Sequence, residues 1–544
     1  MRLFFAMAYP EGLVDLIENL HQQGVNEAVI CPGSRNAPIM LALVRHGGFR
    51  CYSISDERSA GFFGLGRALK TKRPVIICCT SGSAGLNFAP AVVEAFFQEI
   101  PLIVLTADRP AEWIGQWDGQ TIYQENLFGK HVKHAESFNP FQPNQLVEKA
   151  MAFPQGPVHM NVPITEPFYP TNGEALPQIR EPQAIEAHKT PELDTDFQVK
   201  QGASLLITVG QRPFNQAEND FFAQLALNGI PVIGDATANL PAECQLHHDL
   251  IWANEVNLPS FQPEFHIHFG KSFVSKRIKQ FLRTYKPTAS WLVHPNPIGK
   301  PDPFQCLTRV VRAETISVLT SLCQQTLRGV SAVNSAKNRV EAIQEAYFKK
   351  ESWSELAIYN HLIGAMDSPN SEVHVANSLA IRYINWTENI FTQSEVFSNR
   401  GTSGIDGCLS TAIGASQQTN KLVISLIGDV AFQYDRNALW NAYVGANVRI
   451  IIFNNSGGGI FGILDGAKDL PELDEFMVTK QVFRAKNTAL DAGIDYFEAY
   501  DWNELHQQMQ HFFEPSDRGK ILEIFTDSAV NTQELQAYMR LFKH

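Results

Sequence analysis

The feature that most constrains the fold is a repeated alternation of short apolar runs with helical patterns. The runs NEAVICPGS, RPVIICCTSGSA and IPLIVLTADRP are mostly apolar and end in small or polar residues. Helical patterns such as DERSAGFFGLGRAL and APAVVEAFF lie between them. Continuous apolar strands separated by helices are typical of a parallel sheet covered on both faces. The sequence therefore predicts an α/β protein built from doubly wound parallel sheets.

The alternation occurs in three blocks, and 544 residues are too many for a single core. Residues 165–197 are rich in proline and charge, have no sustained period, and are predicted to link the first two blocks. A helical, charged segment separates the second block from the third. The similar size of the blocks is the only sign of internal duplication. We predict domains over residues 1–180, 198–330 and 350–544.

Composition and charge exclude several classes of protein. The formal charge is −12, whereas a nucleic-acid-binding surface would be basic. The eight cysteines show no C-x-x-C spacing, and several lie in apolar runs, which indicates buried free thiols in a reducing compartment. No stretch reaches the ~20 apolar residues of a membrane span, and Pro10 breaks the apolar run at the N-terminus. We expect a cytoplasmic protein that binds neither nucleic acid nor membrane.

Two neighbouring strand ends in the third block carry metal-binding residue types. LVISLIGD ends in Gly428 and Asp429, and after a helical segment VRIIIF leads into Asn454 and Asn455. The crossover of such a βαβ unit can place its strands side by side, so Asp429 and Asn455 would share one edge of the sheet. Carboxylate, amide and bare glycine carbonyl oxygens suit Mg²⁺, which completes its shell with phosphate and water. A surface turn is the alternative, because Asn and Gly are common loop residues.

This spacing resembles the thiamine diphosphate motif, in which Gly-Asp-Gly precedes Asn-Asn. The resemblance implies that Asp429, the side chain of Asn455 and the carbonyl of Gly457 hold Mg²⁺ or Mn²⁺. Val430 stands where the motif has its second glycine. Enzymes with this motif also need an apolar wedge that bends the cofactor and a carboxylate that meets N1′ of its pyrimidine ring.

Glu57, in SISDERSAGFFGLGRAL, is the candidate for that carboxylate. It stands between a strand-like segment and a helix of small residues, where loss of hydration should raise its pKa. Alternatively, Glu57 is an ordinary acidic residue in the first turn of a helix, with Asp56 as the cap.

Several segments together narrow the resemblance: CPGSRNAP, SDER, TADRP, SNRGTSGIDG and NNSGGGIF. They closely resemble the 2-succinyl-5-enolpyruvyl-6-hydroxy-3-cyclohexene-1-carboxylate (SEPHCHC) synthases, thiamine diphosphate-dependent transferases of menaquinone biosynthesis. That family decarboxylates 2-oxoglutarate and adds the resulting succinyl carbanion to isochorismate in a 1,4-addition, giving SEPHCHC and CO2. The resemblance implies pyrimidine-binding, middle and diphosphate-binding domains in that order. It also implies a homodimer or homotetramer with active sites between subunits.

The resemblance further implies a role for residues in each matched segment. The catalytic residues would be Glu57, Gln120 and Arg35. The cofactor would contact Glu57, Thr80, Ile405 as the wedge, Gly428, Asp429, Asn455 and Ile460. The substrates would contact Ser34, Arg35, Arg109, Gln120, Lys276, Arg277, Ser378, Arg382, Arg400, Phe461 and Leu464. Arginine suits such dicarboxylates because its planar fork matches a carboxylate, although Lys276 and Arg277 could face solvent, and Phe461 and Leu464 could be ordinary core.

Two departures and three alternatives bear on this interpretation. Gly119 precedes Gln120 where some members of the family carry Asn, and the same stretch lacks the histidine pair of pyruvate-type decarboxylases, which favours carboligation. An acetolactate synthase would not need so many cations. A nucleotide-binding oxidoreductase would show G-x-G-x-x-G after a strand, which is missing. A catalytically dead relative is disfavoured because Glu57, Asp429 and Asn455 occur together.

Overall fold

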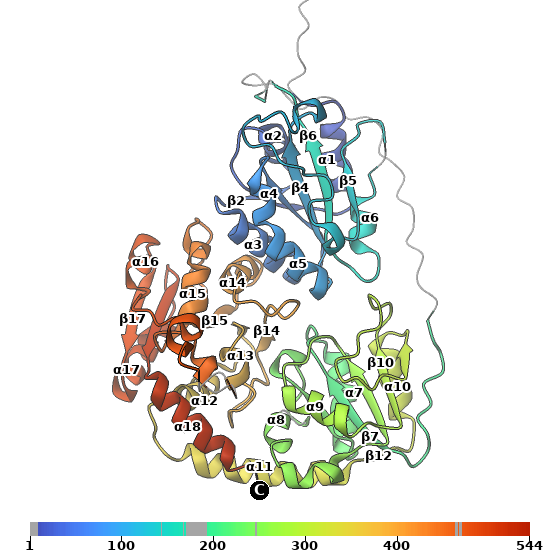
Figure 1. The fold of residues 1–544 in the computed structure, drawn as a ribbon, viewed down its shortest axis with the longest axis vertical. Helices are drawn as coiled ribbons and strands as arrows, with labels where there is room; N and C mark the ends of the chain where they lie inside the picture. Colours follow the sequence, from blue (N-terminus) through green and yellow to red (C-terminus); the bar gives the residue numbers. More distant parts are fainter. Residues whose placement is uncertain are drawn as a thin grey trace, which may run out of the picture. The chain divides into compact units, whose positions relative to one another are not determined.

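The computed structural model describes residues 9–142, 144–166, 168–169, 193–244, 247–462, 466 and 470–543. The chain forms two compact units. Unit 1 takes residues up to 190 together with 399–420 and 435–445, and unit 2 takes 191–398, 421–434 and 446–544. Three sheets with exclusively parallel pairings, each accompanied by helices, confirm the predicted α/β class (Figure 1). The predicted linker lies largely outside the described residues, and the predicted domain boundaries stay predictions.

Sheet A belongs to unit 1 and has the strand order β2-β1-β3-β4-β6-β5. Its strands are β1 (Glu27–Ile30), β2 (Arg50–Ser53), β3 (Val75–Cys79), β4 (Leu102–Asp108), β5 (Ala135–Ser137) and β6 (Val158–Pro163). Its helices are α1 (Leu13–Gln22), α2 (Ala37–His46), α3 (Glu57–Thr71), α4 (Ser83–Asn87), α5 (Ala89–Gln98), α6 (Leu146–Met151) and the 3₁₀ turns η1 (Ala111–Trp113) and η2 (Gly129–His131).

The apolar strands of sheet A are buried on both faces, as their continuous hydrophobic runs predict. In β3, Ile76 and Cys78 join the core formed with α1, α2 and α6. Ile77 points to the other face, where α3 packs so closely that a Cβ on Gly64 would lie 2.5 Å from its side chain. Successive residues of a strand point to opposite faces, so a sheet with helices on both sides requires every position of β3 to be apolar or small.

A second helix pair completes unit 1. α14 (Cys408–Ser416) packs against α3, and η5 (Arg436–Leu439) lies beside α14. The helices approach through glycines: a Cβ on Gly66 would lie 2.1 Å from the Thr411 carbonyl oxygen, and one on Gly414 would lie 2.2 Å from the Phe63 carbonyl oxygen. Backbone meets backbone at these points, so no larger residue fits without separating the helices.

Sheet B begins unit 2 and has the order β11-β10-β9-β7-β12, with β8 also paired to β7. Its strands are β7 (Ser204–Val209), β8 (Val232–Gly234), β9 (Phe265–Phe269), β10 (Ala289–Val293), β11 (Arg309–Val311) and β12 (Arg328–Gly329). Its helices are α7 (Gln216–Leu227), η3 (Ala236–Ala238), α8 (His248–Ile251), η4 (Glu255–Phe261), α9 (Lys276–Thr284), α10 (Thr315–Cys323) and α11 (Ser331–Phe348).

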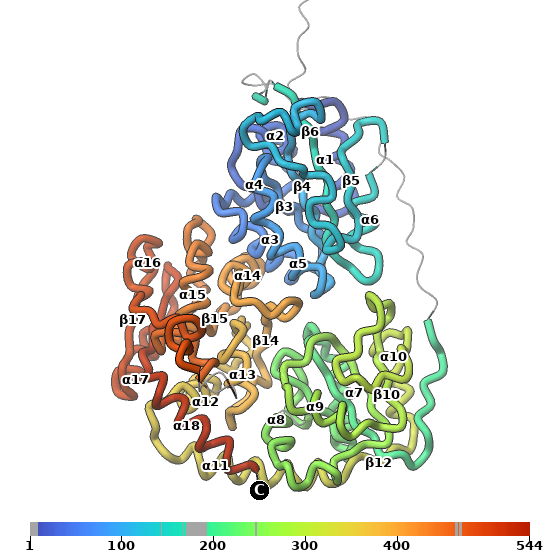
Figure 2. Tube along the Cα trace, in the orientation of Figure 1, coloured from blue at the N-terminus to red at the C-terminus, as the bar shows by residue number. Residues whose placement is uncertain are grey.

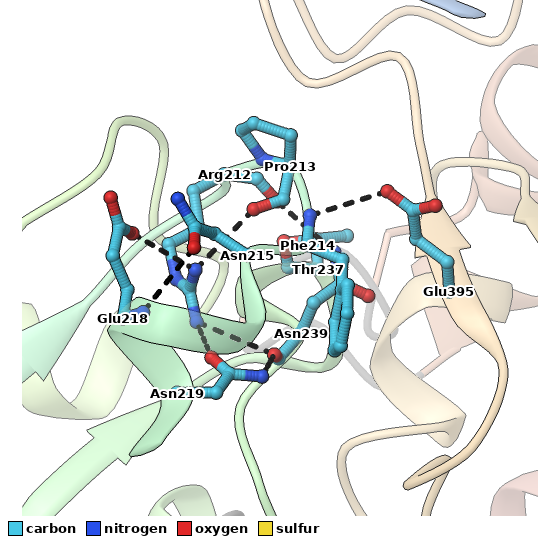
Figure 3. A network of polar contacts seen from close by, with 9 residues as sticks. All are labelled: Arg212, Pro213, Phe214, Asn215, Glu218, Asn219, Thr237, Asn239 and Glu395. Carbon is cyan, nitrogen blue, oxygen red and sulfur yellow. Dashed lines mark hydrogen bonds and ion pairs between the residues drawn. The ribbon is translucent and has the colours of Figure 1, made fainter. Parts of the chain in front are cut away.

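A partly buried polar network fixes the loop after β7 against sheet C (Figure 3). Arg212 pairs with Glu218, with 3.2 Å between Nη1 and Oε2. The Asn239 side chain donates to the Arg212 carbonyl at 3.0 Å and bonds the backbone of β14 (Glu395–Phe397) through both its nitrogen and its oxygen. The Phe214 amide donates to Glu395 at 3.2 Å. The two sheets of unit 2 are thus joined by directional bonds as well as by apolar packing.

Sheet C has the order β14-β13-β15-β16-β18-β17, the same relative order as sheet A, which supports the suggested internal duplication. Its remaining strands are β13 (Ser371–Val375), β15 (Leu422–Gly428), β16 (Val448–Asn454), β17 (Asp495–Ala499) and β18 (Lys520–Phe525). Its helices are α12 (Glu355–Met366), α13 (Ala380–Tyr383), α15 (Asp429–Tyr434), η6 (Gly459–Gly462), the π-helical turn η8 (Leu473–Val478), α16 (Lys486–Asp491), α17 (Trp502–Phe513) and α18 (Ser528–Arg540).

The chain leaves sheet B through α11 and enters sheet C through α12 (Figure 2). Apolar residues of α11, α12 and α18 share one continuous core with both sheets of unit 2. All eight cysteines are free, and five of them are buried, so the predicted free thiols are confirmed. Among the described residues, no helix has the length and apolar character needed to cross a membrane.

Candidate active site

The carboxyl edge of sheet C brings together the residues predicted to bind a metal. β15 and β16 pair directly, with Gly428 opposite Phe453, so Asp429 and the Asn454–Asn455 pair leave the sheet at the same edge. The predicted side-by-side placement of these two strands is therefore confirmed. A Cβ built on Gly428 would meet nothing within 4 Å, so the backbone before Asp429 faces open space.

Asp429 is buried, with 4% of its surface exposed. Its Oδ1 accepts from the Val430 amide at 2.8 Å, and its Oδ2 accepts from Nε2 of Gln481 at 2.6 Å. Burial raises the pKa of Asp429 to about 6, and these donors oppose the rise. A carboxylate that has lost its hydration, and that forms no ion pair with a basic side chain within the described ranges, is well prepared to receive a cation.

The two asparagines at the end of β16, Asn454 as its last residue and Asn455 just after it, have different roles. Asn454 is structural: it donates to Glu523 at 2.7 Å and accepts from the Ser456 amide at 3.1 Å, which orders the turn. Asn455 donates from Nδ2 to Oε1 of Glu355 at 2.7 Å. Its Oδ1 is buried and has no hydrogen-bond partner among the residues that the structure describes. Such an orphaned amide oxygen beside a buried carboxylate is what a hard-cation site requires.

The glycines after Asn455 are required by the backbone. Gly457 has φ +155°, and a Cβ there would lie 2.8 Å from the Val478 carbonyl oxygen. Gly458 donates its amide to that same carbonyl at 2.7 Å, which holds the turn against η8. The carbonyl of Gly457 therefore belongs to a tightly fixed loop. Together with Asp429 and Asn455 it supplies the oxygen types that Mg²⁺ or Mn²⁺ prefers, so the residues present fit a metal and diphosphate.

The other residues predicted for this edge lie next to the glycine turn. Ser378, with φ +69°, follows β13, and its carbonyl accepts a hydrogen bond from Arg382. Ile460 and Phe461 are half-buried in η6. A Cβ on Gly459, the first residue of η6, would lie 2.9 Å from Nδ2 of Asn455 and 3.2 Å from the Leu379 side chain. The predicted Leu464 lies outside the described residues.

The carboxyl edge of sheet A gathers the basic residues predicted for the first block. Arg35 donates to the Ile164 carbonyl at 2.6 Å and stacks over the Phe168 ring at 4.6 Å. Burial, with the nearby charge of Arg109, lowers the pKa of Arg35. Two guanidinium groups that repel each other at one sheet edge favour the binding of an anion.

Arg109 fixes the segment that carries Gln120. Its Nε pairs with Asp118 at 2.6 Å, and its Nη1 donates to Ser81 Oγ and to the Gln120 carbonyl, the latter at 3.0 Å. Gln120 is exposed and has φ +55°. The structure thus brings Arg35, Arg109 and Gln120 together, as the sequence predicts.

Glu57 opens α3 after β2, and Asp56 caps that helix by accepting from the Arg58 and Ser59 amides. Burial raises the pKa of Glu57, as predicted. The exposed Ser34 follows Gly33, where a Cβ would come within 2.4 Å of Thr80. The turn after β1 therefore lies directly against Thr80.

Glu94 holds the loop that carries Arg400 and Ile405, and sequence reasoning missed it. Glu94 lies in α5 and is only 1% exposed. Its carboxylate accepts from the Gly401 amide at 2.7 Å, and from the Thr402 amide and hydroxyl at 2.6 Å each. The only sequence signal was a single charge inside the apolar helical run APAVVEAFF.

Lys276 and Arg277 open α9, capped by Ser275. Lys276 is exposed, whereas Arg277 pairs with Asp249 at 3.2 Å. Asp249 also accepts from Nε1 of Trp386 at 2.6 Å. The charge of Arg277 is therefore compensated within unit 2.

Comparison with known proteins agrees with this geometry. The family description "Thiamine pyrophosphate enzyme, N-terminal TPP binding domain" matches residues 11–132, and "Middle domain of thiamine pyrophosphate" matches residues 175–374. A 2-succinyl-5-enolpyruvyl-6-hydroxy-3-cyclohexene-1-carboxylate synthase of Cytophaga hutchinsonii is 38% identical, over 97% of this chain and 98% of its own length. The chain belongs to the SEPHCHC synthase family.

Two further SEPHCHC synthases show the same full-length likeness. Those of Flavobacterium johnsoniae and Phocaeicola vulgatus are each 35% identical over 98% of this chain, and cover 100% and 99% of their own lengths. The predicted resemblance and the thiamine diphosphate cofactor are thereby confirmed.

Proposed function

We propose that this chain is a transferase that decarboxylates 2-oxoglutarate and adds the remaining four-carbon unit to isochorismate, giving SEPHCHC and CO2 for menaquinone biosynthesis. Family membership over nearly the whole chain supports this reaction over that of an acetolactate synthase. The observation that carries the proposal within the structure is the buried Oδ1 of Asn455, which has no partner in the described part of the chain, at the same sheet edge as the buried carboxylate of Asp429.

The edge of sheet C would hold the cofactor's diphosphate and its cation. Asp429, the Oδ1 of Asn455 and the carbonyl of Gly457 would bind Mg²⁺ or Mn²⁺, and the open space at Gly428 would admit the diphosphate. Bound thiamine diphosphate supplies the electron sink that a 2-oxo acid needs in order to lose CO2. Ile405 and Ile460 would provide apolar contacts to it.

Glu57 would manage the proton at N1′ of the pyrimidine ring. Burial raises the pKa of Glu57, which suits a carboxyl group that exchanges a proton with a weakly basic ring nitrogen. Because this carboxylate and the diphosphate site belong to different subunits in related enzymes, we propose a homodimer or homotetramer. We further propose that it acts in the cytoplasm.

The basic residues would bind the carboxylates of the two substrates. Both substrates are dicarboxylates, and fixed guanidinium groups match that charge and shape. At the edge of sheet A, Ser34, Arg35, Arg109 and Gln120 would bind and orient them. The remaining proposed contacts are Lys276, Arg277, Ser378, Arg382, Arg400, Phe461 and Leu464.

A coupled assay tests the proposal. The full chain is incubated with thiamine diphosphate, Mg²⁺, 2-oxoglutarate and isochorismate, and the loss of isochorismate is followed while each component is omitted in turn. We expect consumption only in the complete mixture. Turnover of pyruvate without any consumption of isochorismate would instead identify an acetolactate-type enzyme.

A further inference from the structure

Glu355 is a buried carboxylate behind the proposed metal site, and no role has yet been given to it. It is the first residue of α12 and is 2% exposed. No Lys, Arg or His of the described residues pairs with it. A buried carboxylate without a cation is costly, so its hydrogen bonds should show what it is for.

Those hydrogen bonds hold the carboxylate in one position. Its own amide donates to Oδ1 of Asn531 at 2.9 Å. Nδ2 of Asn531 donates to the Thr526 hydroxyl at 2.9 Å, and that hydroxyl donates to Oε1 of Glu355 at 3.2 Å. The Tyr383 hydroxyl also hydrogen-bonds the carboxylate. Residues of α12, α13 and α18 and of the segment after β18 therefore fix Glu355 from several sides.

The fixed carboxylate determines which way the amide of Asn455 faces. Oε1 of Glu355 accepts from the Thr526 hydroxyl, and it also accepts from Nδ2 of Asn455 at 2.7 Å, so the amide nitrogen is the atom that faces Glu355. The amide oxygen then faces away from Glu355, and this oxygen is the buried atom that lacks a partner among the described residues. Only the oxygen, and not the amide nitrogen, can bind a hard cation.

We propose that Glu355 is a positioning residue that fixes the side-chain amide of Asn455 with its oxygen toward the cation at the edge of sheet C. The inference rests on the proposed metal site and extends it to a residue that contacts one of the proposed metal ligands. Groups that orient metal ligands in this way typically contribute 10- to 100-fold to metal affinity.

The test measures Mn²⁺ binding to the full chain in the presence of thiamine diphosphate, by electron paramagnetic resonance. We expect Glu355→Ala to raise the Kd of Mn²⁺ by about 10- to 100-fold, because the freed amide can rotate. Glu355→Gln retains an acceptor oxygen for Asn455 and should stay within roughly threefold of the wild type. Thermal unfolding of each variant reports whether it folds. If the alanine variant fails to fold, Glu355→Gln still tests the proposal.

Glu523 offers a matched control, because it accepts from Asn454 at the same 2.7 Å and is 1% exposed. Glu523→Ala should lower stability but leave the Kd of Mn²⁺ within roughly threefold, since Asn454 is not a ligand. An equal loss of affinity in Glu355→Ala and Glu523→Ala would overturn the proposal, because both carboxylates would then act only through general packing.

The variant Asn455→Asp separates orientation from packing. A carboxylate offers an oxygen on both sides, so no partner is needed to orient it. In that background, adding Glu355→Ala should not weaken Mn²⁺ binding, and a further loss would contradict the proposal. Asp429→Ala separates failure of the metal site from failure of the role given to Glu355. Unchanged Mn²⁺ binding in Asp429→Ala refutes the metal site itself. Loss of binding in Asp429→Ala, together with normal binding in Glu355→Ala, refutes only the role of Glu355.

Discussion

The buried carboxylate of Glu94 holds the loop that carries Arg400, and its replacement should loosen that loop. Three donors of Gly401 and Thr402 lie 2.6–2.7 Å from its oxygens. A hydrogen bond to a charged group contributes about 1.5–3 kcal/mol, so three of them bound the loss at roughly 9 kcal/mol. Gly401 and Thr402 are partly exposed, so water can replace some of these bonds, and we expect Glu94→Ala to cost about 3–5 kcal/mol.

The conservative variant Glu94→Gln should separate stability from function. It keeps one acceptor oxygen but turns an amide NH2 toward a backbone donor, which should cost about 2 kcal/mol in urea unfolding. Because Arg400 is proposed to bind a substrate carboxylate, loosening it should raise the KM of one of the two substrates about tenfold, equivalent to ~1.4 kcal/mol, with a smaller change in kcat.

Gln98→Ala is the control for this experiment. Gln98 donates to Glu94 from one turn further along α5, at 2.5 Å. Its variant keeps the Glu94 carboxylate that accepts the three hydrogen bonds from the loop, so both KM values should stay unchanged. The reasoning is refuted if Glu94→Gln loses stability yet retains both wild-type KM values, since the carboxylate would then support the fold without positioning Arg400.

Three further changes test other parts of the structure. Glu57→Gln should leave thiamine diphosphate binding largely intact, measured by calorimetry, while removing most activity; full decarboxylation of 2-oxoglutarate by this variant would contradict the assigned role. Burial raises the pKa of Asp435 to about 7, so its contribution to stability is complete below about pH 4 and is lost as the pH rises to about 7, a loss on the order of 4 kcal/mol. Asp435→Asn should flatten the pH dependence of urea unfolding between about pH 4 and pH 7, and an unchanged slope would show that another group causes it. Gly66→Ala places a Cβ 2.1 Å from the Thr411 carbonyl oxygen, so it should cost at least about 3 kcal/mol; a wild-type melting temperature would mean that the helices separate freely.

The sequence predicted those parts of the fold and site that depend on local pattern. Apolar runs ending in Gly428 and Asn454 identified paired parallel strands, and the residues after them identified the edge at which they meet. Position relative to a strand end is a short-range property, so Asp429 and Asn455 could be found without a structure.

The residues that support the site could not be found in this way. Glu94 is 308 positions from Thr402, and Glu355 is 100 positions from Asn455. In the sequence each is one acidic residue in a helical segment, which is usually a solvated charge. Only tertiary packing shows that each carboxylate is buried and meets a particular donor, because no local pattern encodes contacts over such separations.

Sheets A and C share one strand order but present different chemistry at their carboxyl edges. At sheet A, Arg35 and Arg109 follow β1 and β4, and their mutual repulsion favours an anion at this edge, although Asp118 already pairs with Arg109. At sheet C, Asp429 and Asn455 follow β15 and β16, where buried oxygens call for a cation. Under the proposed function, a substrate carboxylate would meet the first requirement, and a divalent metal bound to a diphosphate would meet the second. The shared strand order would then fix where ligands bind, while the few residues after each strand would decide the charge of the ligand.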